Sequence, residues 1–255
     1  MVISLALLGS GAAGVWLYLA ASRFPPEKTN QQLASLAILF AFSTVAAFWL
    51  YLQIPFEFKT ISKEGLSWTT AGWLALIYLV LSIPFLFGGA VIALAISRFS
   101  QSVGRVYFVD LIGASLGCIM SIIALTTLGA ANAVLLVGIL AAMASLLFAL
   151  AERPSRCPLI SGLSLVLLIG LLVGNQSFAW MQVRASGGYD ARNEIVYEKW
   201  NALARISVYE DPHWLQPFGW GLSPTYQGPD PGHLMLLIDA NAGTPIQKWD
   251  GSMDR

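Results

Sequence analysis

The chain has 255 residues, of which 56% are hydrophobic and 11% charged, and its 14 basic and 14 acidic residues leave a formal net charge of zero. Soluble domains carry about 25% charged residues, so this composition excludes an ordinary soluble domain and indicates an integral membrane protein. A nucleic-acid-binding surface is also excluded, because residues 1–176 hold only eight basic against five acidic residues and residues 177–255 hold six against nine.

Six long apolar runs fill most of the first 177 residues, and short segments rich in Pro, Gly and charge separate them. Each run reaches the ~20 residues that an α-helix needs to cross the core of a bilayer. Helices are the natural form there, because lipid offers the backbone no hydrogen bonds. The sequence therefore predicts an α-helical integral membrane bundle of about six transmembrane helices in residues 1–177. The predicted helices cover residues 2–22, 32–54, 68–97, 108–129, 131–151 and 158–177.

The first run contains the sequence GSGAAG at residues 9–14, which fits the Gly-x-Gly-x-x-Gly pattern of dinucleotide sites. Such a site needs a strand before the glycines and a helix after them. Here the glycines lie inside one apolar helix, which favours close packing against another helix. The third run contains Pro84 and Gly88-Gly89, which indicate a kinked packing helix or, alternatively, a gate.

The fourth run begins with an aspartate, Asp110, followed by Gly113 and Gly117. We expect Asp110 to lie at headgroup depth and to cap free backbone N–H groups at a helix start. A carboxylate is inexpensive there, whereas at the bilayer centre it costs at least about 2.5–3.5 kcal/mol. The spacing of Gly113 and Gly117 predicts a small face for packing against a neighbouring helix.

Basic residues predict the orientation in the membrane. Six crossings put the N-terminus and residues 178–255 on the same side of the membrane. Four basic residues lie near the helix ends on that side, and six basic residues lie near the helix ends on the opposite side. The positive-inside rule then places residues 178–255 outside the cytoplasm. We expect a multi-pass protein of the cell's inner (plasma) membrane. The opposite side carries Arg23, Lys28, Arg98, Arg105, Arg153 and Arg156, and the terminal side carries Lys59, Lys63, Arg184 and Arg192.

Residues 178–255 have the charge density of a soluble protein and contain three strand-like runs. They lie at 194–200, 204–210 and 233–240, are rich in β-branched, aromatic or aliphatic residues, and predict a small antiparallel β-rich extramembrane segment. No metal site is predicted anywhere in the chain, because its cysteines and histidines lack ligand spacing. These residues are Cys118, Cys157, His213 and His233.

Several motifs in the right order resemble one family. VYEKWNALARISVYE at 196–210, followed by LLIDANAGTPI at 236–246, resembles the β-rich N-terminal part of the spermidine synthase fold. PFLFGGAVIALAISRF at 84–99 and GRVYFVDLIGASLGC at 104–118 resemble the helices of bacterial membrane proteins in which a multi-helix segment precedes a spermidine synthase-like domain.

The resemblance implies an aminopropyl transferase, in which the amine of a diamine attacks decarboxylated S-adenosylmethionine. Asp239 is similar to the aspartate of the family's L-D-G-x-x-Q turn, although Ala240 replaces the glycine and Gly243 stands at the glutamine position. Asp239 is thus either a turn-forming residue or a substrate contact. Trp200 and Tyr226 either line a substrate cleft or belong to an exposed hairpin that packs on a missing domain.

The cofactor-binding and catalytic parts of the family lie in a Rossmann-like domain, and the sequence has no Gly-x-Gly-x-Gly turn between residue 178 and Arg255. We therefore expect a fragment or split-gene product that holds no cofactor, is inactive alone and associates with a downstream or separate Rossmann-like domain. The alternatives are half of a small-molecule transporter, or a membrane scaffold for a separate catalytic subunit. An active enzyme would need residues 178–255 in the cytoplasm with its donor, which conflicts with the orientation predicted from the basic residues.

Overall fold

The computed structural model describes residues 2–54, 67–151, 157–183, 195–210, 223, 225, 233–239 and 242–247. The chain forms two compact units. The helical unit contains residues 1–124 and 130–183, and the sheet unit contains residues 184–255 together with residues 125–129.

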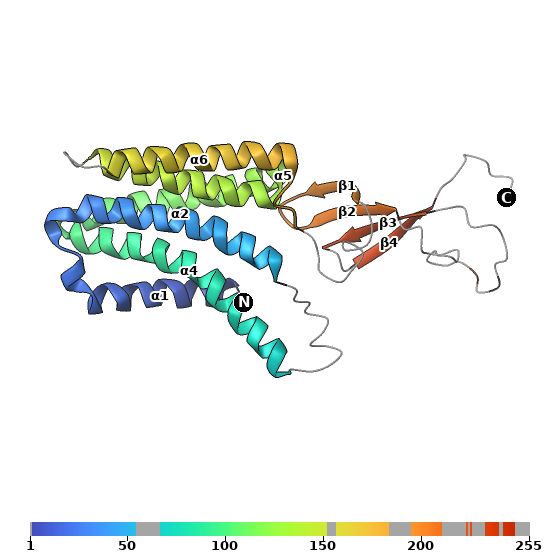
Figure 1. Cartoon of the computed structure of the whole chain (residues 1–255), viewed down its shortest axis with the longest axis horizontal. Helices are drawn as coiled ribbons and strands as arrows, with labels where there is room; N and C mark the ends of the chain where they lie inside the picture. Colours follow the sequence, from blue (N-terminus) through green and yellow to red (C-terminus); the bar gives the residue numbers. More distant parts are fainter. Residues whose placement is uncertain are drawn as a thin grey trace. The chain divides into compact units, whose positions relative to one another are not determined.

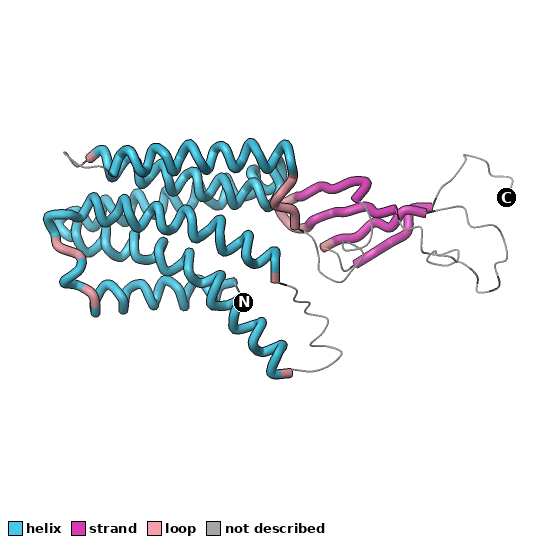
Figure 2. The backbone as a smooth tube through the Cα atoms, viewed as in Figure 1, coloured by secondary structure: helices cyan, strands magenta, loops and turns pink. Residues whose placement is uncertain are grey.

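The described part of the helical unit consists of long apolar α-helices (Figure 1). Each predicted apolar run is helical over most of its length, and Figure 2 shows helices with short loops, and no strand, in the described residues before β1. Four of the described helices are long and apolar enough to cross a membrane, and α1 is a shorter apolar helix. The prediction of a helical membrane protein is therefore confirmed at this level. The helices are α1 (Val2–Leu19), α2 (Thr29–Gln53), α4 (Trp68–Arg98), α5 (Val103–Leu150) and α6 (Cys157–Phe178), with the 3-10 turns η1 (Ala21–Arg23), η2 (Pro26–Lys28) and η3 (Ser100–Ser102) between them.

Helix α5 covers both the fourth and the fifth predicted run, but Gly129 interrupts it. Gly129 has φ 76° and ψ 170°, which is not a helical conformation. The chain therefore forms two helices, 103–128 and 130–150, on either side of this residue. A straight helix of 48 residues would be about 72 Å long, more than twice the ~30 Å thickness of a bilayer core.

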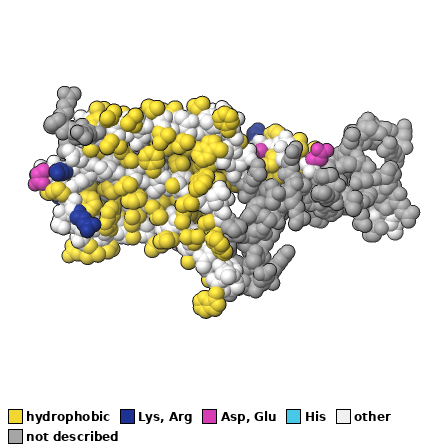
Figure 3. Space-filling model, viewed as in Figure 1, with side chains coloured by type: hydrophobic (Ala, Val, Ile, Leu, Met, Phe, Trp, Pro, Cys, Tyr) yellow, Lys and Arg dark blue, Asp and Glu magenta, His cyan; other side chains and the backbone are white. Residues whose placement is uncertain are grey.

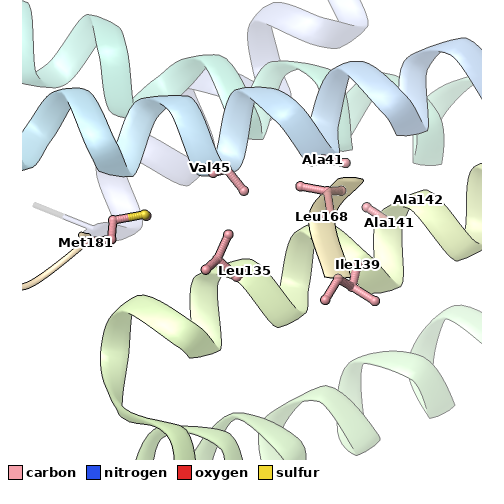
Figure 4. Packing of buried hydrophobic residues seen from close by; sticks show 8 residues of the cluster. All are labelled: Ala41, Val45, Leu135, Ile139, Ala141, Ala142, Leu168 and Met181. Carbon is pink, nitrogen blue, oxygen red and sulfur yellow. The ribbon is translucent and has the colours of Figure 1, made fainter. Parts of the chain in front are cut away.

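Helix α2 packs in the middle of the helical unit and contributes to both of its apolar clusters. In one cluster Ala13 of α1 and Leu33 of α2 pack with Ala90 of α4. In the other, α2 packs against α6 and the second half of α5 (Figure 4). Helices in lipid associate through packing and hydrogen bonds rather than hydrophobic burial, so the fit of these side chains holds the helices together. The second cluster comprises Ala41, Val45, Leu135, Ile139, Ala141, Ala142, Leu168 and Met181.

Two glycines allow α1 and α4 to approach closely. A Cβ added at Gly9 would lie 2.5 Å from Phe85 Cβ and 2.6 Å from the carbonyl oxygen of Ser82. A Cβ added at Gly89 would lie 2.8 Å from Ser10 Cα. Real Cβ atoms do not come this close to other atoms, so only glycine fits at these positions. The interpretation of residues 9–14 as a packing motif is confirmed at Gly9.

The predictions for Asp110, Gly113 and Gly117 are not confirmed. Asp110 is the eighth residue of α5, about 10 Å from its start, so it cannot cap that start, and Ser102 stands at the N-cap position. An added Cβ at Gly113 or Gly117 would meet nothing within 4 Å. The cap prediction is wrong because the helix starts before the apolar run does, and among the described residues no helix packs on the two glycines.

The strands of the sheet unit form one antiparallel sheet in the order β1-β2-β3-β4. Strands β1 (Ile195–Trp200), β2 (Arg205–Glu210) and β3 (His233–Ile238) match the three predicted strands, and β4 (Ala242–Gln247) was not predicted. Pro245 lies within β4, and proline is tolerated on an edge strand such as this one. The face of Tyr209, Met235 and Leu237 is buried.

The surface of the helical unit is mostly apolar along the helices, as expected for contact with lipid (Figure 3). Charged side chains gather at one end of this unit in the same view. That end contains the η1–η2 connection, the end of α4 and the start of α5.

Candidate functional site

Three side chains at the shared end of β1 and β2 form a charged and aromatic cluster. The Nε of Arg205 donates to Oε1 of Glu198 at 2.7 Å, and the indole nitrogen of Trp200 donates to the same oxygen at 2.8 Å. The guanidinium of Arg205 lies 5.9 Å from the centre of the Trp200 ring, within cation–π range. The Arg205 side chain is only 4% exposed, so its charge depends on these contacts.

The short connection between β1 and β2 explains why these side chains meet. The side-chain oxygen of Asn201 accepts the backbone N–H groups of Leu203 and Ala204, both at 2.7 Å. This is the local turn that asparagine favours. It sets the register in which Trp200 lies opposite Arg205. Glu198 lies two residues before Trp200 and therefore on the same face of the sheet.

The Trp200 ring also packs against Gly129, which belongs to the same unit. A Cβ added at Gly129 would lie 3.3 Å from Cδ1 of Trp200. Trp200 therefore has three structural neighbours in Glu198, Arg205 and Gly129. These contacts hold the Trp200 ring in place within its own unit.

Asp239 begins the turn between β3 and β4. Its φ of 51° lies in the left-handed region, which aspartate tolerates better than most residues. One of its carboxylate oxygens accepts the backbone N–H of Arg205 at 2.8 Å, and its own N–H donates to the carbonyl of Arg205 at 2.9 Å. Asp239 thus ties the β3–β4 turn to the start of β2.

The packing of β4 against β3 explains why position 243 is a glycine. A Cβ added there would lie 2.7 Å from Cδ2 of Leu237, so glycine lets β4 approach the buried face of β3. The position at which the family pattern has a glutamine is therefore filled by a residue that serves strand packing.

We predict that Asp239→Ala weakens the β2–β3 region by about 1–2 kcal/mol, because it removes the acceptor of the Arg205 N–H and leaves alanine at a positive φ. Hydrogen exchange of peptides spanning 205–210 in the purified chain should become faster by roughly 5- to 30-fold. Asp239→Asn keeps an acceptor oxygen and tolerates the backbone conformation, so it should exchange nearly as the native chain does. Equal exchange in the native and alanine chains would contradict this role.

The remaining predicted positions give no further site. Tyr226 and His213 lie outside the described residues. Cys118 and Cys157 are not joined in a disulfide; Cys118 is exposed and Cys157 is partly buried. Within the described ranges, no group of three or more His, Cys, Asp or Glu residues could hold a metal ion.

The buried polar side chains of the helical unit are all neutral among its described residues. The hydroxyl of Ser145 donates to the carbonyl of Ala34 at 2.7 Å and lies 2.8 Å from the hydroxyl of Ser161, which links α2, α5 and α6. Because Ser145 uses its one proton on Ala34, Ser161 is the donor between the two serines. These groups satisfy one another inside the bundle.

A second buried polar link lies where α6 ends. The amide nitrogen of Asn175 donates to Asn132 Oδ1 at 2.8 Å, and Asn175 Oδ1 accepts the N–H of Met181 at 2.8 Å. Asn175 therefore joins α6 to the second half of α5 and also closes the end of its own helix.

The Glu198–Arg205 ion pair is a feature of this region that the sequence analysis did not identify. Its signal was present: in two antiparallel strands joined by the four-residue connection 201–204, Trp200 lies opposite Arg205, and Glu198 lies two residues before Trp200 on the same face. Comparison of the chain with protein-family models, curated proteins and solved structures found no match in any of the three.

Proposed function

We propose that this chain is the membrane-anchoring part of a spermidine synthase-like transferase, and that it holds a small sheet next to a separate catalytic module. The observation that carries the proposal is that the hydrogen-bonded polar links between the helices, Ser145 with Ser161 and Asn175 with Asn132, are made by neutral side chains. An anchor needs helix association and no chemistry within the bilayer, whereas carriers of ions or protons place ionisable groups along their path.

The proposal includes six membrane crossings. Four of the described helices are long and apolar enough to cross a membrane, and α1 adds a shorter apolar helix. The break at Gly129 divides α5 into helices about 39 Å and about 31 Å long, each sufficient for a bilayer core. Asp110 precedes Gly129 by about 28 Å along the helix, which keeps its carboxylate near the headgroups.

The sheet supports the same view. Trp200 and Asp239, the described residues most similar to substrate-binding positions, are engaged in contacts that hold the strands and turns in place. This leaves the binding of decarboxylated S-adenosylmethionine and the acid–base chemistry to a Rossmann-like partner. For the transporter alternative, no contact among the described residues supports a path of ionisable groups through the helices.

The six-crossing topology can be tested with single cysteines in a chain whose Cys118 and Cys157 are replaced by serine. Gly104→Cys at the start of α5 and Ala151→Cys just after it are both at exposed positions. If α5 crosses twice, a membrane-impermeant maleimide should label both from the same side of sealed vesicles. Trp68→Cys at the start of α4 should be labelled from the other side. Labelling of positions 104 and 151 from opposite sides would show a single crossing.

A separate measurement tests whether this chain holds the cofactor site. The purified chain in detergent is titrated calorimetrically with decarboxylated S-adenosylmethionine, and no binding is expected at micromolar concentrations. Micromolar binding would place the cofactor site within this chain and overturn the anchor role, whatever the labelling experiment gives.

A further inference from the structure

The charged end of the helical unit brings basic residues from three segments together. Arg23 lies in η1, Lys28 in η2 and Arg98 at the end of α4, and Arg105 follows near the start of α5. Figure 3 shows Lys and Arg side chains at this end, beside an acidic one. We call these four residues the basic end.

The chain segment that carries Arg23 and Lys28 is tied to the end of α4. A terminal nitrogen of Arg98 donates to the carbonyl of Phe24, which ties the end of α4 to the connection between α1 and α2. The Phe24 ring packs edge-on against Trp16, 5.5 Å between ring centres. From the other side, the amide of Gln32 donates to the carbonyl of Pro25 at 3.2 Å. The connection that carries Arg23 and Lys28 is therefore clamped by α1, α2 and α4.

The charge of this end stays positive when its acidic residues are counted. Glu27 lies between Arg23 and Lys28, and Asp110 lies about 8 Å along α5 from Arg105. Among the described residues of this end, there are thus four basic residues and two acidic ones. Arg23 and Lys28 are exposed, and Arg98 is partly exposed. Cations that are already positioned lose little conformational freedom when they bind an anion.

The bilayer itself supplies the matching anion at this depth. The helices that end here are apolar enough to cross a membrane, so the basic end lies where phospholipid phosphates lie. Arginine donates to phosphate oxygens through several N–H groups at once, and lysine adds a point charge. We propose that the basic end binds the headgroup of an anionic phospholipid of the phosphatidylglycerol type. This proposal needs the chain to span a membrane, and it does not depend on the relation to transferases.

The test is a lipid titration of the purified chain, followed by native mass spectrometry, with phosphatidylglycerol and with phosphatidylcholine. The double variant Arg23→Gln/Lys28→Gln removes two exposed charges. Each basic residue near an anionic surface contributes about fivefold, so the preference for phosphatidylglycerol should fall by about 30-fold in this variant. The preference should also weaken as salt is added.

Lys199→Gln is the matched control, because it removes one exposed lysine from β1 in the other unit. It should leave the lipid preference unchanged. Equal binding of the two lipids by the native chain, or an undiminished preference in the double variant, would overturn the proposal. Competition by inorganic phosphate at the same concentration as the lipid would also overturn it, since the site would then take free phosphate. Arg98→Lys, which keeps the charge and loses the planar donors, should reduce the preference less than the double variant does.

Discussion

Gly9→Leu is expected to destabilise the helical unit by at least about 3 kcal/mol, since overpacking typically costs 1–3 kcal/mol and here meets backbone as well as side chain. The added Cβ alone would lie 2.6 Å from the Ser82 carbonyl oxygen and 2.9 Å from the Leu86 nitrogen. Backbone atoms inside α4 cannot move aside, so α1 must separate from α4. Reversible unfolding of the purified chain in mixed micelles should report the loss.

Gly11→Leu provides the matched control for this prediction. It introduces the same side chain into the same helix, two residues away, where an added Cβ meets nothing within 4 Å. Its unfolding free energy should stay within about 0.5 kcal/mol of the native value, as for surface substitutions. If both variants lose the same stability, the α1–α4 contact is not the cause. Gly9→Ala should lie between the native chain and Gly9→Leu.

Hydropathy predicted the helices well because a helix that crosses a bilayer needs an apolar stretch of sufficient length, and such a stretch is visible in the sequence. The run at 68–97 became α4, Trp68–Arg98, and Ser67 caps its start by accepting the N–H of Thr70. The run at 158–177 became α6, Cys157–Phe178. Boundaries marked by breakers and polar residues can thus be read locally, one segment at a time.

The predictions that failed depended on what a residue meets in space. The start of the apolar run near Asp110 predicts a cap there, but a helix can continue into the headgroup region, and α5 starts at Val103. Gly9 and Gly113 both belong to small-residue patterns, yet only Gly9 has a neighbouring helix among the described residues. Spacing alone cannot distinguish the two cases.

The sheet shows the same division between local and non-local information. Strands β1 and β2 followed from β-branched and aromatic runs, and β3 followed from an aliphatic run. Strand β4 contains Gly243 and Pro245, which argue against a strand unless it lies on an edge, and the edge position depends on the other strands. The contact between Asp239 and Arg205 joins residues 34 positions apart, so the family pattern around Asp239 could indicate a turn but not its partner.

Gly129→Ala is expected to destabilise the chain by about 2 kcal/mol, because φ 76° with ψ 170° belongs to a region that is essentially limited to glycine and costs 1–3 kcal/mol for other residues. The new methyl group would also lie 3.3 Å from the Trp200 ring, which must shift slightly. The strain would be relieved if the backbone at position 129 became helical, because alanine favours the helical conformation. The interruption of α5 should weaken, and Trp200 should lose its neighbour.

Two measurements separate this outcome from a general loss of stability. Gly162→Ala in α6, where an added Cβ meets nothing within 4 Å, should not destabilise the chain. With Trp200→Leu in the background, the cost of Gly129→Ala should drop by the part due to the ring contact, while the part due to backbone strain remains, as a double-mutant cycle would show. A Gly129→Ala chain as stable as the native one would mean that the backbone at this position is helical. The two halves of α5 would then form a single straight helix too long for one crossing, and the six-crossing topology would fail with it.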